Sequence, residues 1–100
     1  MKNYDVFLST AAREDLDEIY NYISSTLKEP STALKLVGLI ENELLSLSQM
    51  PYRHPERNVG LYAGKGYRQL AVKNYTAIYR IEEDTRRVII ITVQYSKRNI

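Results

Sequence analysis

The side chains in this sequence that could do chemistry are mostly cations, and they gather in its second half. Residues 51–100 carry ten basic and four acidic side chains, whereas residues 1–50 carry four basic and eight acidic ones, for a net charge of +2. Such an asymmetry favours an acidic or polyanionic partner for the basic half, although it also fits the solvated faces of helices and strands. The cations that we predict to bind a target are Arg57, Lys65, Arg68, Lys73, Arg80, Lys97 and Arg98.

Contact with a phosphate or with an acidic partner is what these residue types could support. The candidates are Arg68, Tyr95, Lys97 and Arg98, with Arg68 first because its planar fork suits a phosphate or a carboxylate. Arg68 fits a structural ion pair with a helix carboxylate equally well, and Tyr95 also fits packing in the core. His54 is the only histidine, but its place between two prolines is more typical of a loop residue than of a catalyst.

Several classes of protein are disfavoured by what the sequence lacks. With no cysteine, the chain has no disulfide framework and no thiolate metal site. We find no metal-ligand motif, phosphate-binding loop or Ser-His-Asp arrangement, and we therefore expect no metal and no cofactor. The apolar runs fall far short of the roughly 18 residues that a membrane span needs, and the N-terminus lacks the apolar stretch of a secretory signal. We expect a cytoplasmic protein that does not enter a membrane.

The spacing of apolar residues in the first half predicts one strand and two helices. Ser9 and Thr10 offer hydroxyls for a helix N-cap, and Pro30 suits the first turn of the second helix. Gly38 weakens that helix, and we expect a close backbone contact there. The predicted elements are a strand over 4–8, a helix from Ala11 to Leu27 or Lys28, and a helix from Pro30 to Met50.

The second half changes to a period of two after a loop over 51–66. Strands are predicted over 67–73, 75–81 and 87–96, and their short connections make an antiparallel meander. The unbroken apolar run Val88–Ile91 predicts a central strand that is buried on both faces. We therefore expect one domain over 1–100 of the α+β class, in the order β-α-α-β-β-β, with the helical hairpin packed on an antiparallel sheet.

This arrangement predicts where the cations meet. Arg68 begins a strand, whereas Lys97 and Arg98 follow the last one, and we expect all three at a single lip of the sheet. Alternation along the middle strand places Arg80 on the face opposite Tyr79, where it either projects from the uncovered face as part of the binding surface or is simply solvated.

The order of the elements and the texts GYRQLAVKNYTAIYRI and RVIIITVQYSKRN resemble the RelE/ParE superfamily of bacterial toxins. In the first helix Ala12, Asp15-Leu16, Ile19 and Tyr22 stand at the spacing found in the ParE branch. The resemblance implies the toxin of a type II toxin–antitoxin operon, which arrests growth and is silenced by a cognate antitoxin protein. The RelE branch cuts mRNA on the ribosome, and the ParE branch poisons DNA gyrase and is not known as a nuclease. Cutting RNA through its 2′-hydroxyl needs a base, an acid and cations for the charged phosphorane. If this chain resembles the RelE branch in activity, the resemblance implies Arg68, Tyr95, Lys97 and Arg98 as the catalytic candidates.

Two departures from the RelE branch favour the ParE branch. The position after Tyr75, often Arg in RelE-like toxins, is Thr76 here, and the last-strand position that carries Arg or His is Ser96. A shift of one residue in the alignment would bring Lys97 or Arg98 to that second position. We therefore rank a non-catalytic poison of gyrase above a metal-independent mRNA endoribonuclease, and keep as a third reading a non-toxic binding module of the same fold.

Overall fold

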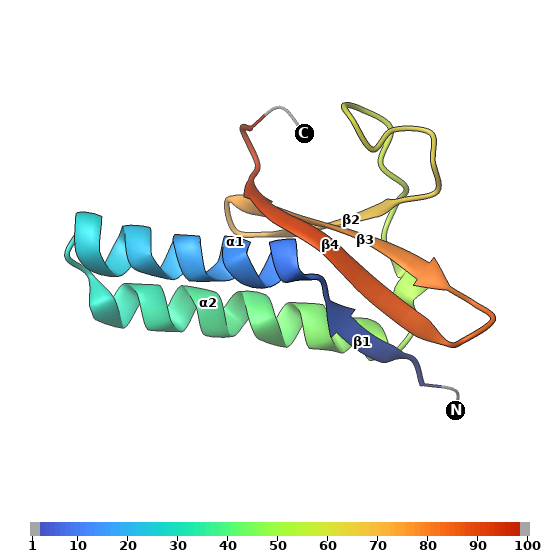
Figure 1. The fold of residues 1–100 in the computed structure, drawn as a ribbon, viewed down its shortest axis with the longest axis horizontal. Helices are drawn as coiled ribbons and strands as arrows, with labels where there is room; N and C mark the ends of the chain where they lie inside the picture. Colours follow the sequence, from blue (N-terminus) through green and yellow to red (C-terminus); the bar gives the residue numbers. More distant parts are fainter. Residues whose placement is uncertain (1–2, 99–100) are drawn as a thin grey trace.

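The computed structural model describes residues 3–98 and has four strands and two main helices (Figure 1). The predicted α+β order β-α-α-β-β-β is confirmed. The sheet order is β1-β4-β3-β2. The last three strands form the predicted antiparallel meander, but β1 pairs with β4 in parallel, so the sheet is mixed rather than purely antiparallel. The elements are β1 (Asp5–Leu8), α1 (Thr10–Asn21), α2 (Pro30–Leu45), β2 (Arg68–Val72), β3 (Tyr75–Glu82) and β4 (Arg87–Tyr95).

The central position predicted for the last strand is confirmed. Strand β4 lies between β1 and β3, and its parallel pairing with β1 sets Val6 beside Val88 and Leu8 beside Ile90. Val88 and Ile90 are fully buried, whereas Ile89 is half-buried. Burial on the second face is therefore only partial.

Helix α1 begins where the sequence predicts, because Ser9 caps it. The Ser9 hydroxyl accepts the Ala12 N–H at 3.0 Å and donates to the Ile91 carbonyl at 2.8 Å, which also ties the helix start to β4. The α-helix ends at Asn21, and a π-helical turn over Tyr22–Thr26 continues it. Tyr22, the first residue of this turn, is exposed.

Helix α2 begins at Pro30 as predicted but ends at Leu45, before the predicted Met50. A 3₁₀ turn over Ser46–Ser48 replaces its last part, and Met50 takes a left-handed conformation with φ of 49°. The close contact expected at Gly38 is wrong, because apart from its chain neighbours and its own helix backbone no atom lies within 4 Å of the position that a Cβ would take.

The core lies between the helical hairpin and one face of the sheet (Figure 1). Tyr79 on β3 is fully buried there, and its hydroxyl donates to the Pro51 carbonyl at 2.6 Å. That bond holds the start of the long connection between α2 and β2 against the sheet. The helices and strands contribute the remaining buried apolar side chains: Ala12, Leu16, Ile19, Ile23, Ala33, Ile40, Leu44, Leu47, Leu70, Val72, Ala77, Val88, Ile90 and Val93.

Candidate functional site

The strand register separates the cations that were expected at one lip. Arg68 lies opposite Tyr79 on β3, whereas Tyr95, which precedes Lys97 and Arg98, lies opposite Tyr75. Tyr79 and Tyr75 are four positions apart, which corresponds to roughly 13 Å along a strand. The expected gathering of Arg68 with Lys97 and Arg98 is therefore wrong.

Arg68 supports the loop that precedes its strand. One guanidinium nitrogen, Nη1, donates to the His54 carbonyl at 2.6 Å and to the Tyr52 carbonyl at 3.3 Å. The guanidinium also lies 5.1 Å from the centre of the Tyr52 ring and 3.8 Å from the Glu56 carboxylate, and the Arg68 side chain is only 20% exposed. Arg68 therefore binds mainly loop carbonyls. The sequence had suggested, as one alternative, an ion pair with a carboxylate on a helix, and that alternative is wrong.

Arg57 and Arg80 are also engaged within the fold. Arg57 donates from Nε to the Val59 carbonyl at 3.0 Å and from Nη1 to Gln69 Oε1 at 2.8 Å. Arg80 pairs with Glu82 on the same strand. The hydrogen bond from Arg80 lowers the pKa of the Glu82 carboxyl, and a second ion pair with Arg87 at 2.9 Å acts in the same direction.

The remaining predicted cations are exposed, and three of them lie near one another. Lys73 sits in the β2–β3 turn with φ of 54°, and the neighbouring Asn74 carbonyl accepts the Ser96 N–H at 2.7 Å. That bond brings the segment with Lys97 and Arg98 to the same end of the sheet as Lys73. We call Lys73, Lys97 and Arg98 the basic end of the sheet. Lys65 is exposed in the loop before β2.

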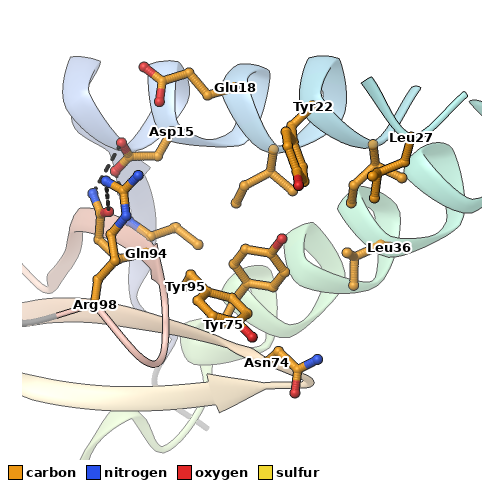
Figure 2. Close-up of a pocket in the computed structure, with 13 residues that line it drawn as sticks. Asp15, Glu18, Tyr22, Leu27, Leu36, Asn74, Tyr75, Gln94, Tyr95 and Arg98 are labelled. Carbon is orange, nitrogen blue, oxygen red and sulfur yellow. Dashed lines mark hydrogen bonds between the residues drawn. The ribbon is translucent and has the colours of Figure 1, made fainter. Parts of the chain in front are cut away.

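A groove of about 730 Å³ opens beside this basic end, between the helical hairpin and the ends of β3 and β4 (Figure 2). Figure 2 shows Tyr22 on the helical side and the rings of Tyr75 and Tyr95 on the sheet side. The latter two rings meet edge to face with centroids 5.8 Å apart. Tyr95 therefore packs on Tyr75, yet it remains exposed at the groove. The other lining residues are Asp15, Glu18, Ile19, Ile23, Leu27, Leu36, Asn74, Val93, Gln94 and Arg98.

Asp15 fixes the polar end of the groove. Its carboxylate accepts the Thr92 hydroxyl at 2.5 Å, the Val93 N–H at 2.9 Å and the Gln94 amide at 3.4 Å. Arg98 in turn donates to Gln94 Oε1 at 3.4 Å. Strand β4 has a β-bulge here. Ile78 on β3 pairs with Thr92, but the next residue, Tyr79, pairs with Ile90, so the register skips Ile91. A carboxylate on α1 therefore satisfies backbone and side-chain donors that follow a bulge.

The two positions that depart from the RelE branch, and the histidine that the sequence disfavoured as a catalyst, offer little support for proton transfer. The Thr76 and Ser96 hydroxyls lie 2.8 Å apart and bond each other. His54 is half-buried with Nε2 lacking a partner, and burial lowers the pKa of its imidazole. Its carbonyl accepts Arg68, which places it away from Tyr95 and the groove. Among residues 3–98 there is no group of three or more side chains that could hold a metal ion, and no helix long and apolar enough to span a bilayer.

Sequence reasoning missed the groove. It named Tyr95 and Arg98 but treated Tyr22 and Asp15 only as parts of a family resemblance. The groove combines residues from α1, from the π-helical turn and from β4, so no single segment of the sequence carries a periodic signal for it. One local signal for the groove was present: Asp15, Glu18 and Tyr22 bring acidic and aromatic side chains to the side of the first helix that faces the sheet.

Comparison with known proteins identifies what this fold is similar to. A protein-family model described as the ParE toxin of the type II toxin–antitoxin system parDE matches residues 6–100. Among solved structures, a chromosomal ParDE system from P. aeruginosa aligns with a TM-score of 0.79 at 22% identity, over 97% of this chain and 100% of that one. No curated protein matches the chain.

Two further solved structures share the fold. The toxin–antitoxin complex RelBE2 from Mycobacterium tuberculosis aligns with a TM-score of 0.64 at 24% identity, over 95% of this chain and 93% of that one. The archaeal RelE–RelB complex from Pyrococcus horikoshii OT3 aligns with a TM-score of 0.63 at 12% identity, over 98% and 99%. At these identities the structural likeness speaks for the fold.

Proposed function

Because the chain belongs to the ParE family of toxins from type II toxin–antitoxin systems, we propose that it arrests growth by binding DNA gyrase and not by cutting RNA. The family membership makes it a toxin of such a system. The finer proposal concerns the target and the absence of a catalytic step.

The observation that carries this proposal is the pair of hydroxyls at Thr76 and Ser96. In the resemblance to RelE-like toxins these two positions hold cations or a histidine, which would stabilise the phosphorane and move protons. Here they hold two neutral hydroxyls whose oxygens are 2.8 Å apart and which bond each other. Hydroxyls do not titrate near neutral pH and carry no charge for a phosphorane. The pair therefore supports a toxin that acts by binding.

The exposed cations are the residues that we propose for contact with the target. Lys73, Lys97 and Arg98 form the basic end of the sheet, and Lys65 is exposed in the loop before β2. Arg57, Arg68 and Arg80 were also predicted as target contacts, but in this proposal they contribute indirectly. Each is bonded within the fold and supports the local structure around it. Charges at the rim of an interface mainly accelerate association and set partner choice.

The cognate antitoxin is the second proposed partner, and we propose the groove of Figure 2 as its seat. Two of the similar structures are complexes of a toxin with an antitoxin. Tyr22 and Leu27 are exposed at the groove, with Leu36 beside them. An amphipathic helix that lays its apolar face into such a groove would cover them.

Expression from a tightly controlled promoter tests the proposed function. We expect DNA synthesis, followed by thymidine incorporation, to fall before protein synthesis, followed by methionine incorporation. Lys97→Ala/Arg98→Ala should weaken the arrest, whereas Arg13→Ala/Lys35→Ala, which removes the same charge from the helices, should not. An early fall in translation with cut mRNA would instead support the RelE-like endonuclease, and unimpaired growth would support a non-toxic binding module.

A further inference from the structure

The loop over residues 57–66 exposes large apolar side chains to solvent. Leu61 is 70% exposed and Val59 is 56% exposed, in a loop that contains three glycines. Single exposed apolar residues are common on protein surfaces and carry no meaning by themselves. This loop is held in a fixed conformation, however, so its two exposed residues are presented in an ordered arrangement.

The loop is fastened at its base by Arg57. The Arg57 N–H donates to the Tyr67 carbonyl at 2.7 Å, and the Arg57 carbonyl accepts the Gly64 N–H at 3.3 Å. Its guanidinium holds the Val59 carbonyl at 3.0 Å and Gln69 Oε1 at 2.8 Å. The loop is thus closed on itself and joined to β2.

Further contacts order the tip. The Tyr62 ring packs edge to face on Tyr67 with centroids 5.1 Å apart, and the Ala63 N–H donates to the Gly60 carbonyl at 3.2 Å. Gly60 and Gly64 adopt φ of 77° and 71°, which lets the chain turn tightly there. A loop that is already ordered loses little conformational entropy on binding. The favourable free energy of burying its exposed side chains is therefore offset less by that cost.

The charge of the loop indicates the kind of surface that it fits. Residues 57–66 contain Arg57 and Lys65 and no acidic residue. The exposed tip is aliphatic, whereas proteins that hold single-stranded nucleic acid offer exposed aromatic rings for base stacking. The two tyrosines of this region pack on each other and are half-buried. A protein surface with an apolar pocket and an acidic margin complements these features.

We propose that the loop over 57–66 anchors the toxin in its protein target, with Leu61 and Val59 entering an apolar pocket that has an acidic margin. The inference rests on the proposed function in requiring a protein target. In Figure 1 the loop lies next to the start of β2, whereas the C-terminal end of β4 lies next to α1. No residue of the loop lines the groove proposed for the antitoxin, so the two surfaces are separate.

The test compares two leucines of similar exposure. Leu61→Glu changes the loop tip, and Leu34→Glu changes a residue on α2 that is 67% exposed. The concentration of toxin that halves plasmid supercoiling by purified gyrase should rise about tenfold or more for Leu61→Glu, the effect of losing a central contact. It should stay within about twofold for Leu34→Glu, and the thermal midpoints of both variants should match the parent. Equal potency of Leu61→Glu and the parent would overturn the inference.

Growth arrest in cells separates this inference from the proposed function. If the parent protein does not inhibit gyrase but Leu61→Glu still abolishes arrest, the gyrase proposal fails and the loop inference stands with another protein target. Binding of a single-stranded RNA probe that depends on Leu61 would contradict a protein target and overturn the inference. A parent protein that neither arrests growth nor inhibits gyrase would overturn both.

Discussion

Asp15 offers the sharpest test of how the groove is built. Replacing it with alanine removes the acceptor of the Thr92 hydroxyl and of the Val93 N–H. Thr92 and Val93 are both buried, so water cannot easily take the place of the carboxylate. The lost bonds join α1 to β4 across the wall of the groove.

The size of the effect follows from the number of donors left without a partner. Each buried donor that loses its acceptor costs about 1–3 kcal/mol. Asp15 itself is half-buried, so some water will enter, and we expect a total near the lower end, about 2–3 kcal/mol. For a domain of 100 residues this corresponds to a fall in Tm of roughly 10–20 °C.

Thermal and urea denaturation followed by circular dichroism measure this loss. Asp15→Asn keeps one acceptor oxygen and should lose less than about 1.5 kcal/mol. Asp17→Ala is the matched control, because Asp17 lies exposed on the same helix and its loss tests the effect of helix charge alone. If Asp15→Ala is no less stable than Asp17→Ala, the carboxylate does not join α1 to β4 as described.

Two further substitutions test the interior of the fold. Gly38→Ala should stabilise the protein by about 0.5–1 kcal/mol in urea denaturation, because helix propensity improves and nothing lies within 4 Å of the new Cβ; a destabilised variant would contradict this. Tyr79→Phe should cost about 0.5–1.5 kcal/mol near pH 7 by removing the hydroxyl bond to Pro51. Burial raises the pKa of Tyr79 from 10.0 to about 12, so its contribution is present below pH 10.0 and is lost as the pH rises toward 12. Between pH 10 and 12 the free energy of unfolding of Tyr79→Phe should therefore fall less steeply than that of the parent protein. Equal slopes for the two proteins would refute the assignment of the raised pKa to Tyr79.

The elements could be predicted from the sequence because each has a strong local cause. Ser9 caps α1, Pro30 opens α2, and the apolar run through Val88 and Ile90 needs cover that only a central strand receives. The π-helical turn after Asn21 and the early end of α2 were not predicted, since both depend on how the hairpin packs and not on the residues alone.

The candidate site could be predicted only in part. Lys97 and Arg98 lie exposed at a strand end, as the chain order indicates. The place of Arg68 could not be predicted, because it depends on strand register and on the path of a loop without periodicity, whose carbonyls occupy its guanidinium. The groove depends on Tyr22 and Tyr95, which lie far apart in the sequence, lining the same cavity, and no local pattern encodes that.

We propose that this toxin acts by binding gyrase, and supercoiling of a relaxed plasmid by the purified enzyme measures that binding most directly. With the toxin at rising concentration, we expect supercoiled product to fall in a dose-dependent way and to recover when the cognate antitoxin is added. Supercoiling that proceeds at its normal rate with the toxin in large excess over gyrase would contradict the account.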